Sequence, residues 1–437
     1  MQLLQEYGLL FFYLLPIALV LLWRSWVRRR ASLRQQALLE ENRKSGLLEP
    51  ASLHPNIDQQ VCIGCGSCAA ACPEGDVIGL INDRAELINP THCIGHGACA
   101  AACPVQAITL VFGSEKRGVD IPTVDKNFET NVPGLFIAGE LGGMGLIRNA
   151  VEQGRQALEA VRKKAGIGTG SDLDIVIVGA GPAGFSATLA AHQHKLRYRT
   201  VEQEALGGTV SHYPRGKIVM TQPVMLPLVG LVKLRETSKE ALLDFWTSTT
   251  QSTGITINFQ ERMEAVVRTD TGFVVKTTRG EYRTRTVLLS IGRRGTPRKL
   301  DVPGEELSKV VYRLIDPEQY RGQHVLVVGG GDSAMEAACS IADEPDTHVA
   351  LSYRSDSFSR AKEKNRARVE QAVKTGRLQV LLKSSVKEIL PQHVVLDHDG
   401  QRLELPNDAI IVSAGGILPT GLLKEMGVQV NTKFGTA

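Results

Sequence analysis

The chain has 437 residues, of which 43% are hydrophobic and 22% are charged; this length and composition favour several globular domains. The formal net charge is only +4, which is too small to indicate a nucleic-acid-binding protein. Seven of the eight cysteines lie between Cys62 and Cys103, and the eighth is Cys339. A secreted disulfide framework is therefore excluded, because the rest of the chain is nearly free of thiols.

The N-terminal segment predicts a membrane anchor. Tyr7–Trp23 contains no charged residue, and Met1–Gln5 adds uncharged length interrupted by Glu6; about 20 apolar residues are needed to span a bilayer. Positive charge follows this stretch, whereas a signal peptide carries it in front. The basic residues are Arg24, Arg28, Arg29 and Arg30. By the positive-inside rule we expect a single-pass protein of the cytoplasmic membrane, with its N-terminus outside and its other domains in the cytoplasm. Residues 1–30 form the anchor and its basic flank, and residues 31–55 form a polar, partly helical linker; a buried helix or a cleaved signal is the alternative.

Two stretches of the chain are near-copies. Cys62–Pro73 reads CIGCGSCAAACP, and Cys93–Pro104 reads CIGHGACAAACP. The first has the spacing of bacterial iron–sulfur proteins, in which three thiolates on a tight loop face one cluster and the fourth cysteine ligates the other cluster. The second keeps this spacing but has His96 where its twin has Cys65. A zinc site and a redox disulfide are the alternatives.

Residues 56–111 thus resemble a two-cluster ferredoxin, a small α+β domain. The resemblance implies one cluster on Cys62, Cys65, Cys68 and Cys103, and a second on Cys72, Cys93, Cys99 and the residue at position 96. His96 departs from the family pattern and leaves three states open: a [4Fe–4S] cluster with His96 as a ligand, a [3Fe–4S] cluster, or an unfilled site. An imidazole in place of a thiolate raises the reduction potential, so we expect two clusters of unequal potential.

Residues from Leu173 onward, LDIVIVGAGPAGFSATLAA, predict a first dinucleotide-binding unit. An apolar strand runs into Gly179-x-Gly181-x-x-Gly184 and then into a helix of small residues. In this arrangement the N-terminus of the helix holds a pyrophosphate. The next strand ends at Glu202, an acid expected to bind a ribose hydroxyl.

A second unit begins at His324 with HVLVVGGGDSAMEAA. Its fingerprint is Gly329-x-Gly331-x-x-Ala334, and no ribose-binding acid follows the second strand. The basic residues at that place are Arg354, Arg360 and Lys362. An arginine there accommodates the 2′-phosphate of NADP, so we predict NADPH rather than NADH; a solvated basic loop is the alternative.

Two such units in this order are similar to the thioredoxin-reductase-like flavoproteins, class II of the pyridine nucleotide–disulfide oxidoreductases, over residues 112–437. The resemblance implies an α/β architecture with two Rossmann-like domains: an FAD-binding domain at 166–300, an NAD(P)H-binding domain at 301–417, and a return segment toward the FAD domain at 418–437. The FAD contacts it implies are Gly179, Gly181, Ala183, Gly184, Glu202, Gly207, Gly208, Thr209 and Gly292. The NADPH contacts it implies are Gly329, Gly331, Asp332, Ser333, Ala334, Arg354 and Arg360.

The segment that closes the FAD domain in this family stands in an unexpected place. The family ends with a G-x-F-x-A-G-D sequence, and nothing like it follows Thr420. The stretch Val132–Val161, which begins VPGLFIAGE, has that form. Gly139 and Glu140 then stand near the flavin, with glutamate in place of the usual aspartate. We infer a circular permutation in which residues 112–165 complete the FAD domain, since permutation is tolerated where the original termini lie close together; an independent linker is the alternative.

No catalytic side chain and no Cys-x-x-Cys beside the flavin are predicted, and Cys339 is expected to be a structural, small hydrophobic residue. Flavin exchanges two electrons with nicotinamide and single electrons with a cluster. We therefore predict an NAD(P)H-dependent oxidoreductase that passes electrons between NADPH, FAD, the two iron–sulfur clusters and an acceptor or donor, such as a quinone, a cytochrome or another redox protein. The direction of flow and a homodimeric assembly stay open. The alternatives are a redox-sensing or scaffolding subunit of a membrane electron-transfer complex and a thiol or disulfide reductase that uses Cys339.

Overall fold

The structure is a computed structural model. It describes residues 2–44, 48, 50, 53–93, 95–114, 118–143, 145–213, 218–220, 223–233, 237–293, 295–358, 361 and 363–435, with the backbone alone for 2–13, 44, 218, 220 and 296. The chain divides into two units, one of residues Met1–Glu115 with Gly435–Ala437 and one of residues Lys116–Phe434. The first unit has a core around its cysteines, and the second has several buried clusters along its two main sheets.

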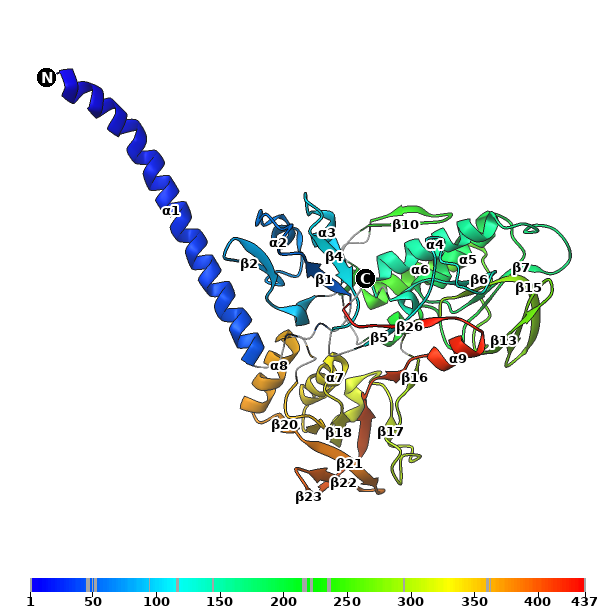
Figure 1. The fold of residues 1–437 in the computed structure, drawn as a ribbon. Helices are drawn as coiled ribbons and strands as arrows, with labels where there is room; N and C mark the ends of the chain where they lie inside the picture. Colours follow the sequence, from blue (N-terminus) through cyan, green and yellow to red (C-terminus); the bar gives the residue numbers. More distant parts are fainter. Residues whose placement is uncertain are drawn as a thin grey trace. The chain divides into compact units, whose positions relative to one another are not determined.

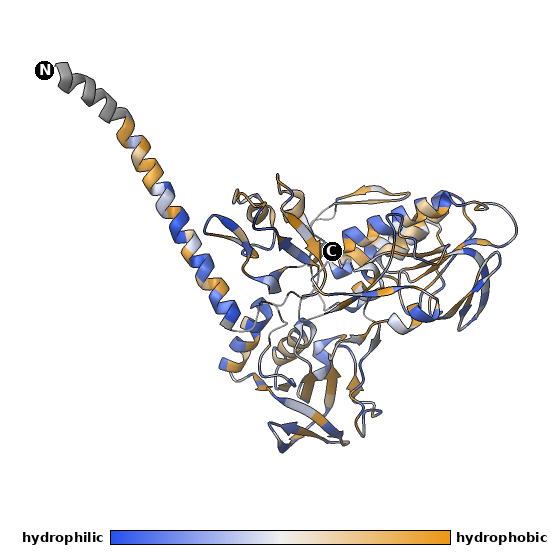
Figure 2. Ribbon diagram, viewed as in Figure 1, coloured by the Kyte–Doolittle hydropathy of each residue, from blue (hydrophilic) through white to orange (hydrophobic). Residues whose placement is uncertain are grey.

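The first unit begins with one long helix, α1 (Gln2–Lys44). Figures 1 and 2 show this helix, which changes along its length from hydrophobic to hydrophilic residues. The apolar side chains from Leu14 to Val27 are exposed. Among the described residues, no helix is long and apolar enough to cross a membrane; the side chains of residues 1–13, the first part of the predicted anchor, lie outside the described residues.

The end of α1 packs against the domain that follows it. The side-chain amide of Gln35 accepts a hydrogen bond from the backbone N–H of Leu80 (2.7 Å). Asn42, only 4% exposed, donates to the carbonyl of Ile88 (2.9 Å). Residues 31–44, predicted as part of a linker, therefore continue the helix and are held to the iron–sulfur domain.

The iron–sulfur domain is a twofold repeat of strand, loop, short helix and strand. The strand β1 (His54–Ile57) pairs antiparallel with β4 (Ile108–Val111), and β2 (Ile78–Ile81) pairs antiparallel with β3 (Arg84–Leu87). The short helices are α2 (Ser67–Ala71), α3 (Ala98–Ala101) and the 3-10 turn η1 (Pro90–His92). Each copy thus places its cysteine loop between strands of different pairs, which brings the two loops into one core.

The second unit contains a six-stranded sheet with mixed strand directions. Its parallel part has the order β6 (Leu135–Ile137), β15 (Gly280–Leu289), β7 (Leu173–Val178) and β8 (Tyr198–Val201), and β13 (Met263–Thr269) and β14 (Gly272–Thr277) continue it as a meander. The helices α4 (Ile147–Arg162) and α5 (Pro182–Gln193) pack together. The strand β7 and the last three residues of β15, Val287–Leu289, are buried and consist mostly of valine, isoleucine and leucine, as expected of parallel strands covered on both faces.

The other sheet of this unit is wholly parallel. Its order is β17 (Val310–Val311), β24 (Ala409–Val412), β18 (His324–Val328), β19 (His348–Ser352) and β20 (Leu378–Leu381). The helices α7 (Asp332–Ala342) and α8 (Glu363–Lys374) accompany it. A separate antiparallel sheet consists of β21 (Ser384–Ile389), β22 (His393–His398) and β23 (Gln401–Pro406).

The remaining strands of the unit are short and form pairs. Strand pairs join β5 (Val119–Pro122) to β26 (Val430–Lys433), β16 (Thr296–Pro297) to β25 (Gly416–Ile417), β10 (Val224–Leu226) to β11 (Gly230–Val232), and β9 (Ile218–Met220) to β12 (Thr237–Ser238). The other helices are α6 (Lys239–Thr253), α9 (Thr420–Glu425) and the 3-10 turns η2 (Glu140–Gly142), η3 (Gly208–His212) and η4 (Pro317–Tyr320). The end of the chain returns to the first sheet, because Leu423 and Val428 are buried in the same core as β7 and β15.

Candidate functional site

The turn between β7 and α5 leaves free space at only one of its three glycines. A Cβ atom on Gly179, whose φ is +100°, would lie 2.6 Å from the carbonyl oxygen of Ser290. One on Gly184 would lie 1.8 Å from the carbonyl oxygen of Gly179. At Gly181 the nearest atom would be 3.9 Å away. The turn therefore packs strand against helix at its ends and stays open in the middle, where a pyrophosphate can approach the helix N-terminus.

Glu202 stands directly after β8, where a ribose-binding acid is expected. Its side chain is only 6% exposed. One carboxylate oxygen accepts the N–H of Ala180 (2.7 Å), and the other accepts the N–H of Glu204 (2.9 Å). Burial raises the pKa of this carboxyl. The bond from Ala180 holds the acid to the glycine turn, and the bond from Glu204 fixes it to the segment after β8.

A cavity of ≈ 670 Å³ runs past this turn, large enough for a dinucleotide-sized ligand. The predicted FAD residues that line it are Gly139, Glu140, Gly179, Gly181, Ala183, Glu202, Gly208, Thr209 and Gly292. Gly184 and Gly207 do not line it: Gly184 is held against the strand, and Gly207 donates its N–H to Ala180 (3.0 Å). The open glycine, the buried acid and the size of the cavity together fit FAD.

The segment Val132–Val161 is built into this same domain. The strand β6 runs parallel to β15, with Phe136 opposite Leu288. Gly139 donates its N–H to the side chain of Gln153 on α4 (2.8 Å). A Cβ on Gly154 would lie 2.0 Å from the carbonyl oxygen of Ala183 on α5, so these two helices touch backbone to backbone. The segment lies beside the FAD fold, where the sequence predicts it; the permutation that would explain its order stays a prediction.

The turn between β18 and α7 has the same plan with different residues. A Cβ on Gly329 would lie 2.4 Å from the carbonyl oxygen of Ser413, whereas nothing lies within 4 Å of one on Gly331. Ala334 is fully buried. Asp332 begins α7 and accepts a hydrogen bond from Asn365 (2.7 Å), and Ser333 follows it. The turn leaves room for a second pyrophosphate at its middle glycine.

The basic residues predicted to select NADPH are only partly described. Arg354 is exposed, two residues beyond the end of β19. Arg360 and Lys362 lie outside the described residues. The ring of Tyr353 stacks on Phe358, with centroids 5.5 Å apart, and lies against the glycine turn at Gly330. An exposed guanidinium here can reach a phosphate without the desolvation of a buried charge.

One charged contact was not predicted from the sequence. Arg313, just after β17, makes a two-pronged ion pair with Glu204, just after β8 (3.0 and 2.9 Å). His212 also lies 2.6 Å from the Glu204 carboxylate. The hydrogen bond from Arg313 lowers the pKa of Glu204. This contact joins the two nucleotide-binding regions beside the cavity, and the only hint of it in the sequence is a second acid two residues after Glu202.

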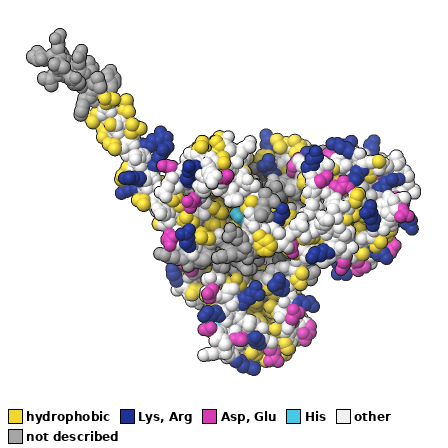
Figure 3. All heavy atoms as spheres, viewed as in Figure 1, with side chains coloured by type: hydrophobic (Ala, Val, Ile, Leu, Met, Phe, Trp, Pro, Cys, Tyr) yellow, Lys and Arg dark blue, Asp and Glu magenta, His cyan; other side chains and the backbone are white. Residues whose placement is uncertain are grey.

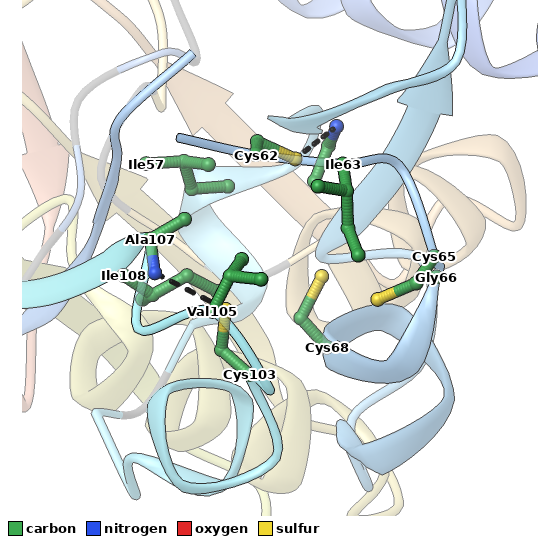
Figure 4. A pocket seen from close by; sticks show the side chains of 11 residues that line it. Ile57, Cys62, Ile63, Cys65, Gly66, Cys68, Cys103, Val105, Ala107 and Ile108 are labelled. Atoms are coloured by element: carbon green, nitrogen blue, oxygen red, sulfur yellow. Dashed lines mark hydrogen bonds between the residues drawn. The ribbon is translucent and has the colours of Figure 1, made fainter. Parts of the chain in front are cut away.

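Four cysteines of the iron–sulfur domain surround one small cavity of ≈ 10 Å³. Figure 4 shows Cys62, Cys65, Cys68 and Cys103 at its edge. Three come from the first repeat, and Cys103 comes from the second. The N–H of Ala85 donates to the sulfur of Cys62 (3.5 Å), and that of Ala107 donates to the sulfur of Cys103 (3.2 Å). The structure thus brings together the four residues expected to hold the first cluster.

The cysteines expected around the second cluster are also neighbours. Burial raises the pKa of Cys93 and Cys99, and the negative charge of a nearby Cys72 thiolate raises both further. The fourth position is His96, whose Nε2 atom is buried and has no hydrogen-bond partner among the described residues. No three of the described His, Cys, Asp and Glu side chains converge to hold a single metal ion. A [4Fe–4S] cluster differs from a single-metal site because its irons occupy separate corners of a cube. Its four ligands bind different irons and therefore do not converge on one point.

Comparison with known proteins finds a matching family for each of the two parts of the chain. Residues 54–104 match the family described as "4Fe-4S dicluster domain". Residues 176–435, more than half of the chain, match the family described as "Pyridine nucleotide-disulphide oxidoreductase". The chain belongs to the pyridine nucleotide-disulphide oxidoreductase family.

As a member of this family, the chain is an NAD(P)H-dependent FAD oxidoreductase that also carries an iron–sulfur domain. Similar proteins include the "Ferredoxin--NADP reductase" of Ignicoccus hospitalis, 29% identical over 268 residues (60% of this chain and 83% of that protein). That of Thermus thermophilus is 30% identical over 270 residues (59% and 77%).

Among solved structures, the bacillithiol disulfide reductase of Staphylococcus aureus superposes with a TM-score of 0.53 at 21% identity, over 60% of this chain and 82% of that one. At this identity the likeness shows the fold alone. It confirms the predicted α/β architecture of a pyridine nucleotide-disulphide oxidoreductase.

Proposed function

We propose that the chain is a membrane-anchored oxidoreductase that passes electrons between NADPH, FAD, two iron–sulfur clusters and an acceptor at the membrane. The observation that carries this proposal is the presence, in one chain, of two dinucleotide turns with open middle glycines and a repeat with two sets of neighbouring cysteines. The first turn would hold FAD through Gly181 and Glu202. The second would hold NADPH through Gly331 and the basic residues after β19.

The combination of cofactors follows from electron counting. Flavin accepts two electrons together from a nicotinamide and returns them singly. In net terms, NADPH would become NADP⁺ and one proton, while each of the two clusters accepts one electron. The relatives named ferredoxin–NADP reductase suggest that the attached iron–sulfur domain takes the place of a separate ferredoxin.

Reduction of a thiol or disulfide is disfavoured by the position of Cys339. This cysteine is only 3% exposed and packs among the aliphatic side chains of the second sheet. Burial raises the pKa of its thiol, which disfavours the reactive thiolate. Since the other cysteines all lie in the iron–sulfur repeat, no redox-active pair remains for the flavin.

The exposed apolar surface of α1 supports an anchor in the cytoplasmic membrane. Figure 3 shows hydrophobic side chains on the described beginning of the helix, followed by basic ones. Leu19, Leu22 and Trp23 are each more than half exposed, although residues of this kind are normally buried in water-soluble proteins. The arginines that follow favour a cytoplasmic location for the rest of the chain. Deleting residues 2–30 should release the protein from washed membranes; release of the full-length chain by carbonate would contradict the anchor.

The electron path is tested by anaerobic addition of NADPH to the purified full-length chain. We expect the flavin absorbance to bleach and electron paramagnetic resonance signals of reduced clusters to follow. With a quinone or a cytochrome as acceptor, turnover should be catalytic. In a Cys68→Ser variant the flavin should still bleach, but electron delivery to the acceptor should fall. Unchanged delivery would contradict the path through the clusters, and absence of NADPH oxidation would favour a sensing or scaffolding subunit.

A further inference from the structure

The glycines on either side of Cys65 and His96 share the same backbone region in the two cysteine loops. Gly64 and Gly66 in the first loop have φ angles of +66° and +78°, and Gly95 and Gly97 in the second both have +76°. These positive values are the left-handed region, in which glycine is strongly favoured. The residue between each pair, Cys65 or His96, is therefore held at an equivalent place by the same turn.

Each loop is also pressed against backbone at its first glycine. A Cβ on Gly64 would lie 2.0 Å from the carbonyl oxygen of Asp83, and one on Gly95 would lie 2.7 Å from that of Leu53. Gly66 and Gly97 each precede a short helix that carries the next cysteine. Neither loop can shift far, so the substitution at position 96 changes the side chain while the frame around it stays the same.

The side chain of His96 has one buried atom without a partner. The surroundings exclude water from Nε2, and no described group donates to it or accepts from it. Leaving a buried polar atom unpaired is unfavourable, because the atom loses its bonds to water and gains none in return. In its twin loop, the side chain at this position lines the cavity of the first cluster. An imidazole nitrogen is also an established type of ligand for the iron of iron–sulfur clusters.

We propose that Nε2 of His96 is the fourth ligand of the cluster held by Cys72, Cys93 and Cys99. This inference rests on the proposed function in so far as the domain must hold two clusters. It deepens that function, because a neutral imidazole in place of an anionic thiolate raises the potential of one cluster relative to the other. The second cluster is then the resting place of the first electron that enters the domain.

The proposal is tested on the full-length protein, loaded with clusters and reduced by dithionite. Dithionite removes any dependence on NADPH or FAD, so a failure of the electron path does not affect the result. Protein grown with ¹⁵N-labelled histidine should show a hyperfine coupling from one histidine nitrogen to one of the two cluster signals. Absence of this coupling while both cluster signals are present overturns the proposal and leaves the proposed function intact.

Two variants and a matched control sharpen the result. His96→Cys should remove the coupling, keep about eight irons per chain, as two [4Fe–4S] clusters require, and move one midpoint potential to a more negative value. His96→Ala should lose one iron from that cluster and show a [3Fe–4S] signal after oxidation. Cys65→His, in the twin loop, should introduce a second histidine coupling and raise the other potential. Wild-type spectra and potentials in both His96 variants, or a [3Fe–4S] signal in the intact wild-type protein, overturn the proposal.

Discussion

The two dinucleotide turns of this chain share a backbone plan and differ in the residue that covers the turn. Gly179 donates its N–H to the last residue of β8, and Gly329 does the same to the last residue of β19. The next residue is Glu202 in one case and Tyr353 in the other. Glu202 accepts the N–H of the residue after the first glycine. Tyr353 lays its ring over that position instead, where a Cβ on Gly330 would lie 2.3 Å away.

This difference explains why the two fingerprints are not interchangeable. A carboxylate beside the turn can accept hydrogen bonds from ribose hydroxyls but repels an added phosphate. An aromatic ring followed by an exposed arginine has no such repulsion. The contact also explains why glycine stands at position 330, in the middle of the GGG sequence of the second turn. The ring of Tyr353 fills the space that a side chain at this position would need.

The helix approaches its strand more closely in the first turn than in the second. Gly184→Ala, which places a methyl group at this close contact, should therefore have the largest effect on stability. The new methyl group would lie 1.8 Å from a backbone oxygen, so we expect a loss of about 3 kcal/mol or more in the free energy of unfolding, together with loss of FAD. Thermal unfolding and bound flavin measure this. The opposite change, Ala334→Gly in the second turn, should cost only about 1 kcal/mol. Similar effects of the two changes would contradict the different spacing.

Removing the acid of the first turn should weaken FAD binding without unfolding the domain. Glu202→Ala removes the carboxylate expected to accept hydrogen bonds from the ribose hydroxyls; at about 1.5–3 kcal/mol for hydrogen bonds to a charged group, FAD affinity should fall about 10- to 100-fold. Flavin release followed by fluorescence is the measurement. Glu281→Ala, which removes an exposed acid that pairs with Lys276, is the control and should leave FAD binding unchanged.

The basic residues of the second turn should determine which nicotinamide is used. Replacing both Arg354 and Arg360 by alanine should weaken NADPH about 10-fold or more, through loss of charge-assisted bonds to the 2′-phosphate, and leave NADH nearly unaffected. Steady-state kinetics with both nucleotides measure the ratio. Arg377→Ala removes an arginine of the same domain that pairs with Asp343 and should change neither. An equal loss for the two nucleotides would refute the assignment.

The contact between the two nucleotide regions should have the smallest effect. Glu204 and Arg313 are each about one-third exposed, so Arg313→Ala should lower the free energy of unfolding by only about 0.5–1 kcal/mol at pH 7. Because Arg313 lowers the pKa of Glu204, the difference should be fully present above the unfolded-state pKa of about 4.3 and be lost as the pH falls through the lower pKa of the folded state. Denaturant unfolding at several pH values checks this. Lys276→Ala, which breaks a pair with Glu281 that is more exposed at both ends, should show less; an effect of Arg313→Ala that does not depend on pH would contradict the pairing.

The sequence alone determined those features that depend on consecutive residues. A strand, a turn with glycine or alanine at three fixed positions, and a helix follow one another in the chain, so Gly181 and Gly331 could be identified without a structure. The cysteine spacing likewise specifies two loops, and the form of Val132–Val161 indicated a piece of the FAD domain before its neighbours were known. Such local patterns carry their own geometry, because each glycine or cysteine is constrained by residues adjacent to it in the chain.

Only the tertiary structure decided which distant residues meet. The parallel pairing of β6 with β15, the ion pair of Glu204 with Arg313, the ring of Tyr353 over Gly330 and the packing of α1 against Ile88 all join residues that no local pattern relates. The unpartnered Nε2 of His96 belongs to the same group. The sequence shows that a nitrogen donor replaces a thiol. Whether that nitrogen is hydrogen-bonded, exposed to solvent or buried without a partner depends on every chain segment packed around it.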